Sequence, residues 1–193
     1  REPFAQEETN AISTLRAGNL NVASRKLMLD AVVQNPEYKN KVLEYNALKL
    51  INSPFDTSAI QEQLYVLNVL ILDPQYAPFV DIIQEMIDEY NVLLTTPSQF
   101  RNGTIDMQEM HRRLVTNDIY DQINMGSFNY VLSMFNNFLF RDPSADEHNA
   151  GITMVDGFVA VLFYETANSK EDFIDIFLHS DDYYEGQVRE LYA

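Results

Sequence analysis

The sequence lacks cysteine and tryptophan, and it is poor in basic residues. Without cysteine it can form no disulfide framework, no thiolate zinc site and no cysteine nucleophile. Lys and Arg number 13 against 29 Asp and Glu, so the formal net charge is 13 − 29 = −16. A nucleic-acid binder needs a basic face, and docking on anionic lipid needs positive charge. The charge balance therefore disfavours both kinds of partner.

Long apolar runs are also missing. No stretch reaches the length of about 18 apolar residues that a membrane span needs, so we expect no transmembrane span. The longest runs, residues 65–72 with Asn68 inside and residues 158–164, are short and predict buried core. Arg1-Glu2-Pro3 has none of the features of a signal peptide, and we expect a mature N-terminus or the position just after a removed segment.

Apolar residues recur at helical spacing along most of the chain, whereas the strict alternation of a strand is hard to find. The stripes are Ile60, Leu64, Leu67 and Ile71; Phe79, Ile83, Met86, Ile87, Tyr90 and Leu94; Val131, Met134, Phe135, Phe138 and Leu139; and Ile152, Val155, Val159 and Leu162. This pattern predicts an all-α fold, an irregular bundle of about eight helices with short loops. We expect one helical domain over residues 1–193, subdivided into N-terminal helices 1–116 and an acidic helical module 117–193.

Helix boundaries are marked by capping and breaking residues. Ser58 and Ser144 each stand three residues before Gln or Glu, the spacing of a capping box, and Ser169 precedes two acids. Thr96 before Pro97 predicts a further helix start. The expected helix ends are at Asn35-Pro36, Ser53-Pro54, Asp73-Pro74, Asn102-Gly103 and Asp142-Pro143.

Two segments could be taken for cation sites. Residues 102–109 match the second half of an EF-hand loop, but Ser98 and Phe100 stand where calcium needs its first two ligands. We therefore interpret this segment as a glycine turn followed by a helix that starts near Asp106. The acids of residues 181–185 could bind a cation together with backbone carbonyls, but we favour a solvated loop or helix start for them.

No catalytic motif stands out. His111 is expected on a polar helix face beside Arg112, His148 at a charged helix start, and His179 near a helix end. Nucleophile-elbow, P-loop and His-Glu-x-x-His patterns are missing. A carboxylate pair for a helical hydrolase remains an alternative that no particular pair supports. We predict no enzyme activity, no catalytic residues, no metal ligands and no cofactor.

Charge and tyrosine both gather at the C-terminal end. Residues 142–193 carry 12 acids against Lys170 and Arg189, a net charge of −10. Tyr183, Tyr184 and Tyr192 crowd the same region, where they either bind a partner protein or close the bundle. We name these three tyrosines as candidate partner-binding residues. The alternative function is a ligand- or cation-binding module that uses this acidic region.

The last 75 or so residues show a recognisable order of helices and turns. An aromatic-rich helix ends at Arg141-Asp142-Pro143-Ser144, a second helix runs to Gly157, Asn168-Ser169 opens a third, and residues 180–185 open another. This order of helices and turns resembles helical repeat modules of exported envelope lipoproteins of Bacteroidota, though the usual Trp of the middle helix is absent. The resemblance implies a structural or interaction subunit of a bacterial envelope assembly. It further implies a protein partner, location in the periplasm, outer membrane or cell surface, and a lipid anchor before Arg1.

Overall fold

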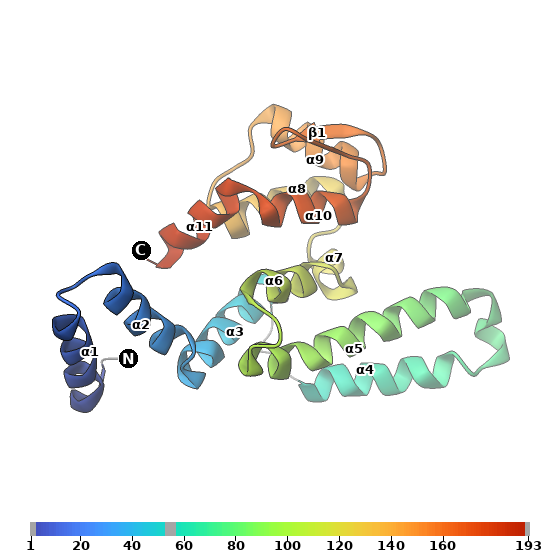
Figure 1. Ribbon diagram of the computed structural model, residues 1–193. Helices are drawn as coiled ribbons and strands as arrows, with labels where there is room; N and C mark the ends of the chain where they lie inside the picture. Colours follow the sequence, from blue (N-terminus) through green and yellow to red (C-terminus); the bar gives the residue numbers. More distant parts are fainter. Residues whose placement is uncertain (1–2, 53–56, 192–193) are drawn as a thin grey trace. The chain divides into compact units, whose positions relative to one another are not determined.

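The computed structural model describes residues 3–52 and 57–191, with side chains described as far as residue 187. Within these ranges the chain forms eleven α-helices, one 3₁₀ helix, one π-helical turn and a single two-stranded hairpin (Figure 1). The predicted all-α class is therefore confirmed. The chain divides into two compact units, Arg1–Glu44 and Tyr45–Ala193. The subdivision expected between residues 116 and 117 stays a prediction.

The first unit consists of α1 (Ala5–Ala17), α2 (Val22–Val33) and the beginning of α3 (Pro36–Leu50). α1 and α2 pack on each other across a turn in which Asn19 and Leu20 take the left-handed conformation. Asn21 then caps α2, because its Oδ1 accepts a hydrogen bond from the Ser24 amide at 2.8 Å. α2 ends at Val33, next to the helix end predicted at Asn35-Pro36, and α3 begins at Pro36.

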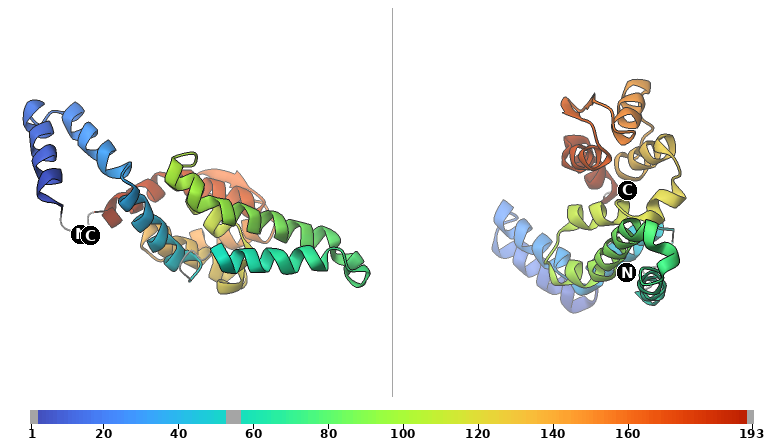
Figure 2. Two further views of the ribbon diagram at one scale, coloured as in Figure 1. Left: turned by 90° about the horizontal axis from the view of Figure 1, so that it is seen from below. Right: turned by 90° about the vertical axis from the view of Figure 1, so that its right-hand side faces the viewer.

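The second unit begins with the rest of α3, from Tyr45 on, and continues with a long helical hairpin. α4 (Thr57–Leu70) packs on α5 (Val80–Asn102), and the 3₁₀ helix η1 (Pro74–Phe79) joins them (Figure 2). Ile60, Leu64 and Leu67 of α4 are buried, as their spacing predicts. The expectation that residues 65–72 are wholly buried is wrong, since Tyr65, Val69 and Leu72 are exposed. The predicted stop at Ser53-Pro54 lies outside the described residues.

The helix start predicted at Thr96-Pro97 is wrong, because Pro97 lies inside α5. Proline supplies no amide, but neighbouring hydroxyls bond the carbonyl oxygens of this stretch: Thr96 Oγ1 donates to Val92 at 2.7 Å and Ser98 Oγ to Thr95 at 2.9 Å. Thr96, Pro97 and Phe100 are all buried, so packing holds the helix together through the proline. α5 ends at Asn102, and Gly103, with a φ of 74°, provides the left-handed cap.

The core of the second unit is built by short helices: α6 (Met107–Val115), α7 (Asp118–Ile123), α8 (Ser127–Met134), the π-helical turn η2 (Phe135–Leu139), α9 (Ala145–Val155), α10 (Lys170–His179) and α11 (Asp181–Leu191). Their largest fully buried side chains are Met110, Leu114, Tyr120, Met134, Phe135, Phe138, Met154, Phe173 and Phe177. The capping box at Ser144 and the cap at Ser169 form as predicted.

A β-hairpin lies between α9 and α10, where the sequence predicted helix and core. β1 (Ala160–Leu162) pairs antiparallel with β2 (Glu165–Ala167), and Leu162 stands opposite Glu165. The expected helical stripe through Val159 and Leu162 is therefore wrong, because α9 ends at Val155. The run 158–164 is not buried core either: Leu162 is buried, but Phe158 and Val161 are exposed.

Candidate protein-interaction surface

Tyr183, the first tyrosine named as a partner contact, belongs to a buried hydrogen-bond network. His111 of α6 places Nδ1 2.9 Å from the Tyr183 hydroxyl and Nε2 2.8 Å from Oδ1 of Asn46 in α3. Because an amide oxygen only accepts, Nε2 carries the proton and Nδ1 accepts from the tyrosine hydroxyl. All three side chains are buried, so three helices far apart in sequence are joined through one neutral imidazole.

This arrangement decides between the two roles that the sequence left open for Tyr183. Its side chain is 2% exposed and closes the core, with its ring edge against His111. Tyr184 is half-exposed and its ring contacts that of Tyr183, so its partner-binding role stays a prediction. Tyr192 lies outside the described residues.

The expectation that His111 lies on a polar helix face is wrong, since the ring is 1% exposed. Burial away from water, and secondarily the positive charge of Lys49, lowers the pKa of His111 to about 3. The sequence suggested a polar face because Arg112 and Arg113 follow His111 directly. Both arginines have partners elsewhere: Arg112 pairs with Asp175, and Arg113 bonds Glu109 at 2.7 Å. Burial also raises the pKa of Tyr183.

We expect His111 to make stability depend on pH between neutrality and mild acid. The unfolded chain takes up a proton near pH 6.5 and the folded chain only near pH 3, so stability is complete above pH 6.5 and falls as the pH is lowered. At about 1.36 kcal/mol per pH unit, the loss between pH 7 and pH 5 is about 2 kcal/mol. The variant His111→Gln has no imidazole and so lacks this pH dependence. In urea unfolding we expect it to be less stable than the wild type at pH 7, and the difference in free energy of unfolding should be about 2 kcal/mol smaller at pH 5.

Tyr183→Phe keeps the buried imidazole and is the matched control, which retains the pH dependence of the wild type. Comparing variants at each pH cancels the contribution of the carboxylates, which all three proteins share. If the free energy of unfolding of the wild type and of His111→Gln changed with pH in the same way, His111 would not be the source of the pH dependence.

Among the acids of residues 181–185, Asp182 is engaged by Arg141. Its guanidinium makes two hydrogen bonds to Glu147, of 2.7 and 2.9 Å, and a third to Asp182 at 2.9 Å. The bond from Arg141 lowers the pKa of Glu147 to about 2. Among the described residues no group of three or more His, Asp or Glu side chains is placed to hold a metal ion. The geometry of Asp182 is that of an ion pair joining α11 to the start of α9.

The other candidate segment follows the interpretation made from its sequence. Gly103 caps the C-terminal end of α5, and Asp106 caps α6 by accepting a hydrogen bond from the Glu109 amide at 2.9 Å. The prediction of a glycine turn and a helix starting near Asp106 is therefore confirmed. His148 and His179 lie in the first turn of α9 and the last turn of α10, where the sequence placed them.

The turn of the β-hairpin has an unusual backbone. Phe163 and Tyr164 have φ values of 50° and 69°, the left-handed pair that a two-residue turn needs and that Asn-Gly normally fills. Phe163 packs its ring near those of Phe135 and Phe177, with centroids 6.1 and 5.9 Å apart. Tyr164 is fully exposed. The strain at Phe163 is offset by core packing, whereas the solvent-facing ring of Tyr164 has no such burial.

Exposed apolar side chains continue from this turn along the hairpin. Phe158, Val159 and Val161 have exposed fractions of 68%, 68% and 57%. Together with Tyr164 they form what we call the hairpin patch. The sequence signal that could have revealed it is the run of β-branched and aromatic residues 158–164 bounded by Gly157 and Asn168, which favours a strand pair.

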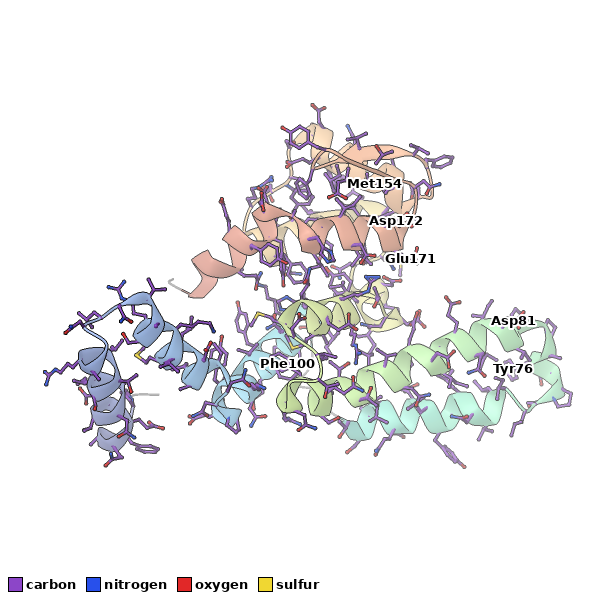
Figure 3. All side chains as sticks on the ribbon, in the orientation of Figure 1. Tyr76, Asp81, Phe100, Met154, Glu171 and Asp172 are labelled. Carbon is purple, nitrogen blue, oxygen red and sulfur yellow. The ribbon has the colours of Figure 1, made fainter. Side chains whose placement is uncertain are left out.

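One side of the hairpin borders an acidic groove. A cavity of about 290 Å³ lies between β2 and α10, lined by Glu165, Thr166, Ala167, Asp172, Asp175, Ile176 and His179. Asp172, at the start of α10, is labelled in Figure 3 together with its neighbour Glu171. Apolar anchors beside negative charge suit a partner that presents apolar side chains flanked by basic ones.

Comparison with models of known protein families, with curated proteins and with solved structures finds no match to this chain. Among the described residues no single helix has the length and apolar character to cross a membrane, although α4 and the segment Pro74–Asn102, bent by 106°, meet those criteria as a pair.

Proposed function

We propose that the chain is a non-catalytic structural or interaction subunit of a bacterial cell-envelope assembly, and that the hairpin patch contacts its protein partner. The observation that carries this proposal is Tyr164, a fully exposed aromatic residue held in a left-handed conformation. A non-glycine residue in that conformation costs about 1–2 kcal/mol. A large aromatic ring placed at such a cost and left in water is typical of a residue that becomes buried on binding.

The surroundings of Tyr164 support the same role. Phe158 and Val161 continue the apolar surface, and patches of this kind on a soluble fold are characteristic of interaction sites. Within residues 3–52 and 57–191 the hairpin is two strands wide, so each strand has one edge along which no other described strand pairs. A partner segment can use both the side chains and the backbone of such an edge.

The envelope location rests on the resemblance of residues 117–193 to helical modules of exported lipoproteins. Two of its steps coincide with helix starts in the structure, at the Ser144 cap of α9 and the Ser169 cap of α10. Export, a lipid anchor before Arg1 and a partner in a larger assembly belong to this proposal.

Replacing Tyr164 by glycine separates the effect of this residue on stability from its effect on partner binding. Glycine relieves the left-handed strain, so we expect the free energy of unfolding to rise by about 0.5–1 kcal/mol in urea unfolding. The same variant should lose the proteins that co-isolate with the wild type from envelope extracts of the source cells, as quantified by mass spectrometry. Stability and partner binding thus change in opposite directions.

Tyr184→Ala is the matched control, because Tyr184 is the half-exposed tyrosine of α11 that the sequence analysis named. If partners are lost with Tyr184→Ala and kept with Tyr164→Gly, the contact surface is at α11 and the hairpin assignment is wrong. Recovery of the wild type from the cytoplasmic fraction alone would contradict the envelope assignment.

A further inference from the structure

The β-hairpin leaves one backbone donor and one backbone acceptor of β2 without a partner. In an antiparallel pair closed by a two-residue turn, the residues next to the turn exchange hydrogen bonds and the following pair does not. Leu162 and Glu165 stand next to the turn, and Thr166 follows opposite Val161, so the N–H and C=O of Thr166 point away from β1. Among the described residues neither group makes a hydrogen bond. Because Thr166 is exposed, this edge of β2 can accept a further strand.

The edge of β2 lies at the groove between β2 and α10. Thr166 itself lines this groove, whose volume is about 290 Å³. A second cavity of about 330 Å³, between α10 and α6, shares Asp175 and His179 with the first. The space beside β2 therefore continues along α10, as an extended segment of a partner requires.

The groove beside β2 carries an excess of carboxylates. Glu165 and Asp172 are exposed, and within the described part of the chain neither forms an ion pair, whereas Asp175 pairs with Arg112. The whole chain adds a net charge of −16 to this local excess. A basic segment is attracted to such a groove and an acidic segment is repelled, so charge selects the kind of strand that can be added.

The two faces of the hairpin differ, and this difference predicts the side chains of the added strand. Val161 and Thr166 share the exposed face, whereas Leu162 and Ala167 on the other face are buried. Glu165 belongs to this second face and lines the groove. In an antiparallel added strand, the residue opposite Thr166 shares its exposed face, and the residues before and after it point toward the groove. Basic residues fit the groove side, and apolar residues extend the hairpin patch on the other.

We propose that the protein partner adds an extended basic segment to β2 as a third, antiparallel strand. One partner residue exchanges both backbone hydrogen bonds with Thr166, and Lys or Arg at the alternate positions faces Glu165 and Asp172. This inference rests on the proposed function and specifies the chemistry of its partner. The hairpin patch supplies the apolar contacts, while the edge of β2 and the groove recognise backbone and charge.

A blocked seven-residue peptide of alternating lysine and valine is the probe, titrated against the full chain by NMR. We expect binding that weakens as salt is added. At saturation the amide hydrogen exchange of Thr166 should slow by at least about tenfold, because its N–H gains an acceptor. The amide of Val161 points to the other edge of the hairpin and should keep its rate. Spermine, which matches the charge of the peptide but has no peptide backbone, should leave the exchange of Thr166 unchanged.

Two variants at position 166 isolate the backbone contribution. Thr166→Pro removes the N–H at an edge position, where proline is tolerated, and should raise the dissociation constant of the peptide by about tenfold or more. Thr166→Val changes the side chain and keeps the N–H, so it should raise this constant by less than about threefold. The exchange measurement uses the wild type, so it remains decisive even if Thr166→Pro disturbs the hairpin.

Two variants at the start of α10 isolate the charge contribution. Asp172→Asn removes a carboxylate that lines the groove and should raise the dissociation constant by about threefold at low salt. Glu171→Gln is the matched control, because Glu171 is an exposed acid of the same helical turn that is not part of the groove lining (Figure 3). We expect it to change the constant by less than about twofold.

The proposal is overturned if the peptide does not bind, if it binds without protecting the amide of Thr166, if Val161 is protected instead, or if Thr166→Pro binds as tightly as the wild type. Equal weakening by Asp172→Asn and Glu171→Gln would contradict recognition by the groove. Co-isolation from envelope extracts separates this inference from the proposed function. Partners lost with Tyr164→Gly and kept with Thr166→Pro contradict only the added strand, whereas partners kept with Tyr164→Gly contradict the hairpin patch as the contact surface.

Discussion

Replacing His111 by alanine is expected to lower the free energy of unfolding by about 3–5 kcal/mol, the largest effect of any single side chain considered. The variant leaves a ring-sized cavity in the core, and truncations of this size cost several kcal/mol by cavity formation. It also removes the hydrogen bonds at 2.9 Å to the Tyr183 hydroxyl and at 2.8 Å to Asn46. A buried hydroxyl that loses its partner adds about 1–3 kcal/mol, partly shared with the cavity cost.

Urea unfolding followed by circular dichroism measures this loss, at pH 7 where the imidazole is neutral. His179→Ala is the control, since His179 is exposed on α10 and its Nδ1 lies 2.8 Å from the carbonyl oxygen of Asp175 one turn earlier in the same helix. We expect it to cost less than about 1 kcal/mol. A His111→Ala variant as stable as the His179→Ala variant would show that the buried hydrogen-bond network does not hold α3, α6 and α11 together.

Gly186→Ala should destabilise the protein by about 2–3 kcal/mol, although the same change inside an ordinary helix stabilises by about 1 kcal/mol. A Cβ on Gly186 would lie 2.2 Å from the carbonyl oxygen of Phe138 and 3.2 Å from Cα of Leu139. Both atoms belong to the backbone of η2, so no side-chain rotation makes room. α11 must move away from η2, and Tyr183 moves with it, which strains the hydrogen bond to His111.

The matched control on the same helix is Glu185→Ala, which changes an exposed side chain and should alter stability by less than about 0.5 kcal/mol. Thermal and urea unfolding of both variants decide the matter. If Gly186→Ala is as stable as the wild type or more so, then α11 does not pack against η2 as closely as the structure places it.

The candidate surface was only partly accessible from the sequence. The sequence analysis named Tyr183, Tyr184 and Tyr192 in the C-terminal region, but Tyr183 is buried, and the fully exposed Tyr164 was not among them. Tyr164 could not be found by helical periodicity, because the run 158–164 is apolar at nearly every position and so carries no period. The distinction between core and surface in such a run depends on which residues the rest of the chain covers.

What the sequence by itself determined are the features that depend on neighbours within about four residues along the chain. Ser144, Ser169 and Asp106 cap their helices because a side-chain oxygen reaches an amide three residues on, whatever the rest of the fold does. The buried stripe of Ile60, Leu64 and Leu67 follows in the same way from helical geometry.

The tertiary structure alone decided the rest. His111 became a core residue because Asn46 and Tyr183, 65 and 72 residues away in sequence, supply partners for both ring nitrogens. Pro97 stayed inside α5 because its surroundings bury it. A polar or helix-breaking residue is tolerated in the core only when distant segments satisfy its hydrogen bonds and fill the space around it, and no local pattern records which segments will meet.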